Sequence, residues 1–157
     1  MHKTPLKVNF TLSNPIQFLA LGFGSGLAPK APGTFGTLAA IPLYFLLTLL
    51  TPTFYALTVL LMTLAGFYIC GKAADDVGVH DHPAIVWDEF VGFFITMFMI
   101  PVSWQSVLLG FILFRFFDIV KPWPISFIDK KVAGGFGIMI DDVLAGAFAL
   151  IIMQLIF

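Results

Sequence analysis

Four long apolar runs dominate this chain and restrict the structures it can adopt. They contain few charged side chains and cover residues 38–50, 54–71, 90–117 and 143–157. Hydrophobic residues make up 59% of the sequence, against roughly 45–50% in soluble domains. We therefore expect an integral membrane protein with an all-α fold, a polytopic helical bundle with short spans, formed as a single domain over residues 1–157.

The run 90–117 decides on which side of the membrane the later segments lie, because it could cross the membrane either once or twice. At 28 residues it is too long for one ordinary span of about 20 residues and short for two. Pro101 near its middle breaks a helix, and Trp104 favours the membrane interface. We expect two short helices here, and a helical hairpin from the two preceding runs around a turn at residues 51–53.

The basic residues support two helices in this run, because lysine and arginine gather on the cytoplasmic side of membrane proteins. With two helices in 90–117 all eight lie on one face, whereas one helix would split them four against four. All nine acidic residues, from Asp75 to Asp142, then share that face. We expect it to be cytoplasmic and to carry the polar site. The basic residues are Lys3, Lys7, Lys30, Lys72, Arg115, Lys121, Lys130 and Lys131.

The segments between the apolar runs are rich in glycine and proline. Residues 15–27 are too short to span and are interrupted by glycines, so we expect a short interfacial or re-entrant helix. Residues 28–37 hold two prolines and two glycines, which predicts a structured loop with free backbone N–H groups. With Thr34 and Thr37, that loop could bind an anion. Residues 134–137 predict a comparable flexible turn.

Two adjacent pairs of acids stand out in so apolar a chain. Asp88 and Glu89 are expected to open one apolar helix, and Asp118 to close another. Asp141 and Asp142 are expected to open the last helix. Carboxylates in this number suit a hard cation, of which Mg²⁺ is the usual case. Capping of helix N-termini explains such acids as well, so both interpretations remain open.

Two cations lie beside one of these acids. Arg115 stands one helical turn before Asp118, and Lys121 stands one turn after it. A salt-bridged helix end explains this spacing, although a cation at the end of an apolar helix is costly unless it is paired. Arg115 with two donors and Lys121 as a point charge could also bind phosphate.

His80 and His82 flank Asp81 in a segment that Pro83 keeps out of a helix. Histidine and aspartate together suggest a metal or substrate site, and hydrogen bonding within a loop explains them equally well. The sequence leaves both readings open.

Several classes of protein and site are disfavoured. The net charge of -1 and the lack of a basic stripe make DNA or RNA binding improbable. Cys70 is the only cysteine, so it forms no internal disulfide. Residues 1–14 have no apolar core before a cleavage site, so we expect no cleavable signal peptide.

Taken together, the polar motifs resemble those of the phosphatidylglycerophosphatase A family. The resemblance covers about residues 14 to 150, with the motifs in order and at family-like spacing. The matching stretches are 24–27, 31–37, 79–82, 85–89, 114–115, 117–119, 121–125 and 137–142. It implies helices gathered around a central one, and a Mg²⁺-dependent phosphatase of the bacterial cytoplasmic membrane. Its substrate would be phosphatidylglycerophosphate, a membrane lipid, and its product phosphatidylglycerol.

Applied to these residues, the resemblance suggests roles for each polar group. Water would attack the phosphate with the help of Mg²⁺, although a carboxylate nucleophile remains open. Asp118 would be a further metal ligand or a base. The metal would be held by Asp88, Glu89, Asp141 and Asp142, and the substrate by Thr34, Thr37, Arg115, Lys121, His80 and His82.

Other functions fit the sequence less well. An ion or proton-coupled transporter would place acids within its helices at mid-membrane, whereas here they gather on one face. An alcohol phosphotransferase acting on a nucleotide-linked lipid would need an aspartate-glycine pattern that the chain lacks. A purely structural subunit would leave three acid-rich stretches without a purpose. The sequence leaves the oligomeric state open.

Overall fold

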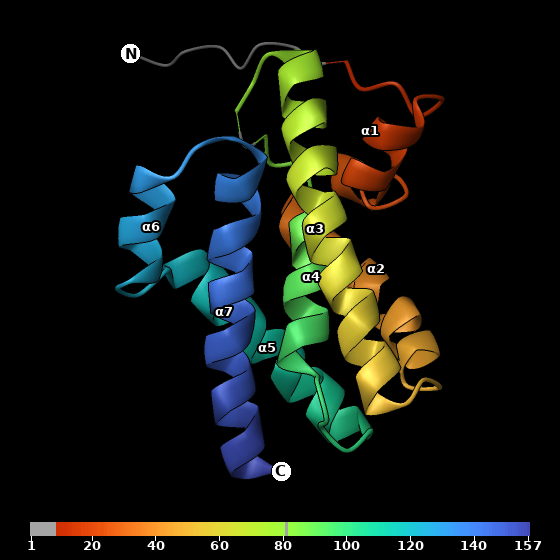
Figure 1. Ribbon diagram of the computed structural model, residues 1–157, viewed down its shortest axis with the longest axis vertical. Coiled ribbons are helices and arrows are strands. Elements are labelled where there is room, and N and C mark those ends of the chain that lie inside the picture. The colour runs from red at the N-terminus through yellow and green to blue at the C-terminus, as the bar shows by residue number, and fades with distance from the viewer. Residues whose placement is uncertain (1–8, 81) are drawn as a thin grey trace.

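The computed structural model describes residues 9–80 and 82–157, and every regular element in that part of the chain is a helix. The expected all-α fold is confirmed (Figure 1). Lys3, Lys7 and Asp81, which entered the charge and metal arguments, lie outside the described residues. The elements are α1 (Pro15–Ala20), the 3₁₀ turn η1 (Ser25–Leu27), α2 (Pro32–Leu47), α3 (Pro52–Val77), α4 (Trp87–Thr96), α5 (Trp104–Val120), α6 (Ile125–Lys131) and α7 (Gly134–Ile156).

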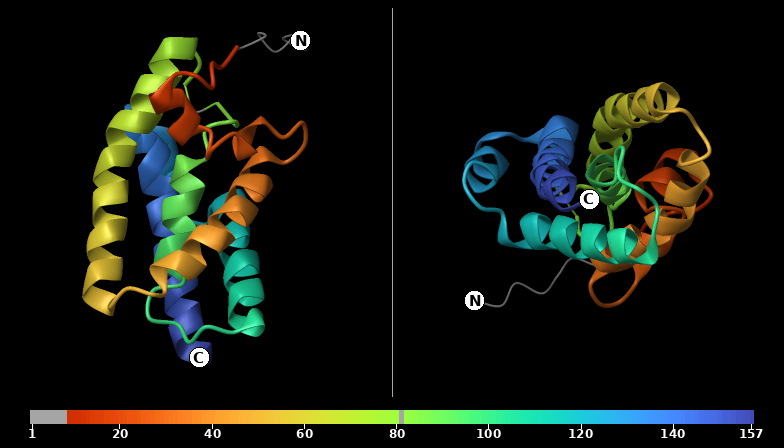
Figure 2. Two further views of the ribbon diagram at one scale, coloured as in Figure 1. Left: turned by 90° about the vertical axis from the view of Figure 1, so that its right-hand side faces the viewer. Right: turned by 90° about the horizontal axis from the view of Figure 1, so that it is seen from below.

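Helix α4 is the centre of the bundle. It contacts α2, α3, α5 and α7, and the view from below places it in the middle of the other helices (Figure 2). All of its residues except Ile95 are buried. Phe90, Phe93 and Phe94 supply much of its packing surface, because each is at most 1% exposed. The central helix therefore carries its two acids, Asp88 and Glu89, into the core of the molecule.

Two of the described helices are long and apolar enough to cross a membrane by length and composition. They are α3, with 26 residues, and α7, with 23 residues. At about 1.5 Å per residue both exceed the thickness of a hydrocarbon core of about 30 Å. The exposed sides of the bundle carry many leucine and phenylalanine side chains, which suits contact with lipid.

The expected break in the run 90–117 is confirmed. Helix α4 ends at Thr96 and α5 begins at Trp104, so the run forms two helices that lead in opposite directions. Ser103 caps α5 by accepting a hydrogen bond from the Ser106 N–H, and the Ser106 side chain accepts from the Ser103 N–H. This reciprocal capping box fixes the start of the helix. The hairpin of α2 and α3 is also present.

Two boundaries differ from expectation. Residues 28–37 are only partly a loop, because α2 begins at Pro32, where a proline at the first helical position lacks only an N–H that would be unpaired anyway. The last helix begins at Gly134, so the expected turn at 134–137 is its first turn. Asp141 and Asp142 consequently lie two turns inside α7 and do not open it.

The N-terminal part of the described chain covers the start of α4. Residues 15–27, expected as one short helix, form α1 and η1 joined by a tight turn. The N–H of Val86 donates to the carbonyl of Ala20 at 2.8 Å, and Gly26 packs directly on the backbone of Ala84. These contacts hold the segment before α4 in place.

Candidate active site

Five acidic side chains from three helices meet at one end of the bundle. Asp88 and Glu89 come from the first turn of α4, and Asp118 comes from the last turn of α5. Asp141 and Asp142 come from α7, at the level where it passes both of the other helices. All five are at most 9% exposed. Burial of so many carboxylates is costly unless cations compensate their charge.

The acids form two overlapping groups with the spacing of metal ligands. One group contains Asp88, Glu89 and Asp142, and the other contains Asp118, Asp141 and Asp142. In each group one oxygen atom of every member lies within 4.8 Å of those of the other two. Asp142 belongs to both groups, so it is the carboxylate that joins them.

Arg115 and Lys121 neutralise part of this charge. Arg115 pairs with Asp118, and its Nη1 lies 3.8 Å from Oε1 of Glu89. The Nζ atom of Lys121 lies 2.7 Å from Oδ2 of Asp141 and 3.5 Å from Oδ1 of Asp118. Both cations are largely buried, with side chains 14% and 27% exposed, so they stay within the site.

Burial alone would lower the pKa of the Lys121 ammonium. The hydrogen bond to Asp141 and the negative charges of Asp141 and Asp118 outweigh that effect, so the pKa of Lys121 rises above its usual range. Lys121 is therefore a fixed positive charge at neutral pH.

Five carboxylates against two cations leave the site with an excess of negative charge. Oε2 of Glu89 and Oδ2 of Asp142 are buried and accept no hydrogen bond from the described residues. Such oxygens cost free energy unless a donor or a cation satisfies them. The donor set is made entirely of carboxylate oxygens, the type that hard divalent cations prefer. The residues present therefore fit a metal ion of the Mg²⁺ class.

The start of α2 covers the Glu89 and Arg115 pair. A Cβ atom added to Gly33 would lie 2.9 Å from Oε1 of Glu89 and 3.1 Å from both terminal nitrogens of Arg115. Only a glycine allows this approach without displacing one of those groups. Sequence reasoning missed Gly33, because a glycine in a presumed loop gives no sign of which side chains approach it.

The two threonines lie in the first turns of the same helix. Thr37 is buried, and its hydroxyl donates to the carbonyl of Gly33 at 2.8 Å. Thr34 is half-buried in the turn that contains Gly33. Both threonines thus lie within about one helical turn of Gly33, the residue that covers the Glu89 and Arg115 pair.

Neither histidine belongs to the two groups of acids. His80 is exposed and lines a shallow cavity with Asp75 and Gly134. The Nδ1 atom of His82 accepts a hydrogen bond from the Ala84 N–H at 3.0 Å, and its ring packs edge-on against Phe10. Burial lowers the pKa of His82, which agrees with this acceptor role. Their expected part in substrate binding stays a prediction.

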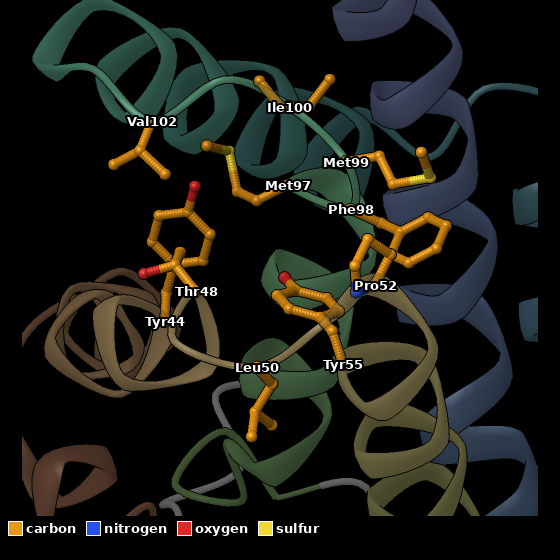
Figure 3. A pocket seen from close by; sticks show the side chains of 10 residues that line it. All are labelled: Tyr44, Thr48, Leu50, Pro52, Tyr55, Met97, Phe98, Met99, Ile100 and Val102. Carbon is orange, nitrogen blue, oxygen red and sulfur yellow. The ribbon is translucent and has the colours of Figure 1, made fainter.

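A separate cavity lies at the other end of α4. It has a volume of about 150 Å³ and is enclosed by the end of α2, the start of α3 and the chain that leaves α4 (Figure 3). Tyr44, Tyr55 and Met97 are among its lining residues, and none of the five acids is. The hydroxyl of Tyr55 donates to the carbonyl of Phe94 at 2.6 Å. This cavity therefore has no part in the acidic site.

Comparison with known proteins agrees with the chemistry of the site. Residues 18–157 match the family model described as phosphatidylglycerophosphatase A. A protein of that name from Escherichia coli is 51% identical over 149 residues, which cover 94% of this chain and 87% of the relative. Another of that name, from Haemophilus influenzae, is 54% identical over 151 residues, which cover 95% and 92%.

A third relative has a different name. It comes from Bacteroides thetaiotaomicron, is 42% identical over 144 residues, and has the provisional name phosphatidylinositol-3-phosphatase. The aligned part covers 86% of this chain and 89% of the relative. No solved structure matches the chain.

Proposed function

The chain belongs to the phosphatidylglycerophosphatase A family, and on that basis we propose that it hydrolyses the terminal phosphomonoester of phosphatidylglycerophosphate to give phosphatidylglycerol and inorganic phosphate. The observation that carries the proposal is the meeting of five buried carboxylates with Arg115 and Lys121 at one end of an apolar helical bundle. A lipid phosphate matches both features: its phosphate group suits the charged site, and its acyl chains suit the apolar surface of the bundle.

In this proposal the acids hold Mg²⁺. Asp88, Glu89 and Asp142 would form one set of ligands, and Asp141 would extend it toward the second group. When bound, the metal would neutralise charge on the phosphate and assist the attack of water. Asp118 already pairs with both Arg115 and Lys121, an arrangement that favours a role as ligand and positioning group over a role as proton acceptor.

Arg115 and Lys121 would hold the phosphate. Arg115 keeps its Nε atom buried without a partner among the described residues, so the guanidinium retains a donor for an incoming oxygen. The first turn of α2, with Gly33 and Thr34, covers the same guanidinium and would complete the phosphate pocket. A carboxylate nucleophile is the alternative to water, and a phosphorylated acid trapped during turnover would distinguish the two.

We further propose that the protein is a multi-pass protein of the bacterial inner membrane with this site facing the cytoplasm. Support comes from the two apolar helices of sufficient length and from the grouping of the described basic residues toward the end that carries the acids. Labelling of a cysteine introduced at Thr53, in the α2–α3 hairpin, should then succeed only from the periplasmic side. Labelling from the cytoplasm would contradict this orientation.

The activity is tested by release of phosphate from phosphatidylglycerophosphate by the purified protein, with Mg²⁺ or with a chelator. Phosphatidic acid and phosphatidylinositol 3-phosphate serve as competing substrates. We expect turnover of phosphatidylglycerophosphate, and its loss on chelation. Preferred turnover of either competitor would replace the proposed substrate, while activity unaffected by chelation would remove the metal from the mechanism.

The ligand assignment is tested by Asp88→Asn, Glu89→Gln, Asp141→Asn and Asp142→Asn, each assayed across a Mg²⁺ titration. We expect each to lose at least about 100-fold in rate, because each removes a charge that the reaction uses. Asp75→Asn is the matched control, since Asp75 is an exposed acid in α3 outside the cluster. Rates near normal in all four site variants would end the assignment.

A further inference from the structure

The segment that follows the site on α5 has a pattern not used by the proposed reaction. Trp123 is 78% exposed and Phe127 is 53% exposed, whereas Ile125 between them is fully buried. Lys130 and Lys131 close α6 and are both exposed. The segment therefore presents aromatic rings at its start and positive charges at its end.

The direction of α6 places its aromatic residues and its lysines at different levels along the bundle. Helix α6 runs alongside the first half of α7 and antiparallel to it, so its lysine end is level with the start of α7 (Figure 1). Trp123 lies two residues after Lys121, which ends α5 and pairs with Asp118 and Asp141. The lysines thus lie beyond the acids, toward the end of the molecule where α7 begins, and Trp123 lies nearer the middle.

A second exposed tryptophan lies near the other end of α5. Trp104, which begins this helix of 17 residues, is 73% exposed, and Trp123 lies three residues beyond the end of the helix. Helix α5 crosses the bundle obliquely (Figure 2), so its two ends differ in depth by less than its length of about 25 Å. Tryptophan gathers at both membrane interfaces. Trp123 accordingly marks the interface beside the acids, and Lys130 and Lys131 reach the layer of head groups.

The lysines are available to a partner from outside the protein. Neither forms an ion pair with a described residue, and Lys131 instead lies 5.7 Å over the ring of Phe127. Asp129 offsets one of the two charges, which leaves α6 with a net positive charge of one. Cations at this depth face the phosphate groups of lipids, and anionic head groups complement them.

We propose that residues 123–131 form a docking surface for anionic membrane lipid, in which Trp123 and Phe127 lie among acyl chains and Lys130 and Lys131 bind the charged head group. The surface begins two residues after Lys121, so a lipid held there lies on the same end of the bundle as the acidic site. The binding of lipid at this surface does not depend on the proposed reaction. Only the further idea that the surface supplies substrate to the acidic site rests on the proposed function.

Tryptophan fluorescence in nanodiscs tests the binding without any turnover. The protein carries Trp104→Phe in all samples, so that Trp123 is the exposed tryptophan and Trp87, at 8% exposure, is the buried one. Trace amounts of brominated phosphatidylserine or brominated phosphatidylcholine are the quenchers. A further Trp123→Phe sample gives the signal of Trp87 alone.

We expect phosphatidylserine to quench Trp123 with a preference of about fivefold, the factor that corresponds to about 1 kcal/mol for one net lysine charge near the surface. Lys130→Gln with Lys131→Gln should bring the preference to one or below, because Asp129 then leaves α6 with a net negative charge of one. Lys72→Gln is the matched control and should leave it unchanged, because Lys72 is paired with Asp76 at 2.5 Å on α3. Equal quenching by both lipids, or a preference that survives in the double variant, would overturn the proposal.

The supply of substrate is tested separately by kinetics in the same nanodiscs. The double variant should raise KM for the lipid phosphate and leave kcat unchanged, since neither lysine contacts the acids. Lack of any activity would reject the proposed function and leave the quenching result standing. An unchanged KM with lost quenching preference would show that the surface binds lipid without supplying the site.

Discussion

Lys121 and Asp141, twenty residues apart in the chain, join the end of α5 to α7 through a hydrogen bond of 2.7 Å from Nζ to Oδ2. Lys121 closes α5 in the left-handed backbone region, with φ 49°, which costs a residue other than glycine roughly 1–2 kcal/mol. The contact with the acids offsets that cost. The end of α5 is therefore held to α7 by charge, at the place where the acids meet.

Lys121→Met should destabilise the protein, because it leaves Asp141 buried beside Asp118 without their shared cation. Loss of one partner of a buried pair costs about 3–5 kcal/mol, and the partial exposure of Lys121 reduces this to about 2 kcal/mol. Combining it with Asp141→Asn should recover part of the loss. Chemical denaturation in detergent measures this double-mutant cycle, and strictly additive effects would show that the two side chains are not coupled.

Gly33→Ala should lower phosphatase activity by at least about tenfold, because the new methyl group would displace Glu89 or Arg115 by several tenths of an ångström. Leu38→Ala is the control on the exposed face of the same helix. Steady-state phosphate release measures both. Activity of Gly33→Ala equal to that of the control would mean that the start of α2 can withdraw from the pair without consequence.

Asp142→Asn should greatly reduce the gain in stability that Mg²⁺ gives the parent protein. Without metal the variant should be more stable than the parent protein by about 1–2 kcal/mol, since it removes one buried charge from two groups of acids. With Mg²⁺ at about 100 times its dissociation constant, the parent should gain about 2.7 kcal/mol and the variant much less. Thermal unfolding with chelator and with Mg²⁺ measures both. An equal gain in the two proteins would place the metal elsewhere.

The contribution of His82 to stability should fall as the pH drops below about 6.5, the ordinary pKa of histidine in the unfolded chain. Burial lowers the pKa of His82 in the folded state, so at this residue the unfolded state binds more protons in this window, and its contribution rises with pH. His82→Asn should remove this contribution, because asparagine does not titrate, while its amide oxygen can still accept from the Ala84 N–H. His80→Asn, at an exposed position, is the control, and an unchanged slope in His82→Asn would contradict the assignment.

Much of the site was predictable because charge is costly in an apolar chain. The acids and the two cations could be named from the sequence, and the grouping of basic residues required two helices in the run 90–117, which α4 and α5 confirm. Once these two helices are fixed, Asp88 and Asp118 must emerge at the same end of the bundle. The sequence thus predicted the composition of the site and its placement at one end.

Other features depend on tertiary contacts that sequence does not reveal. Pro32 and Gly134 lie in glycine-rich stretches that predict a loop and a turn, yet each residue begins a helix. Proline is tolerated at the first helical position, and packing against neighbouring helices decides whether the residues after it continue as a helix. The early start of α7 places Asp141 and Asp142 inside the bundle. The approach of Gly33 to Glu89 likewise depends on how α2 crosses α4, which no local pattern records.

The meeting of α4 and α7 sets a limit on variation across the family. A Cβ atom on Gly146 would lie 2.5 Å from the carbonyl oxygen of Gly92, and one on Gly92 would lie 2.4 Å from the ring of Phe114. The separation of the helices that carry Asp88 and Asp142 is therefore set by touching backbones. In a saturation library, glycine alone should survive at these two positions, while neighbouring lipid-facing positions should accept many apolar residues. The number of amino acids tolerated at a position would thus indicate how close it lies to the contact between α4 and α7 that keeps the acids within ligand distance of one another.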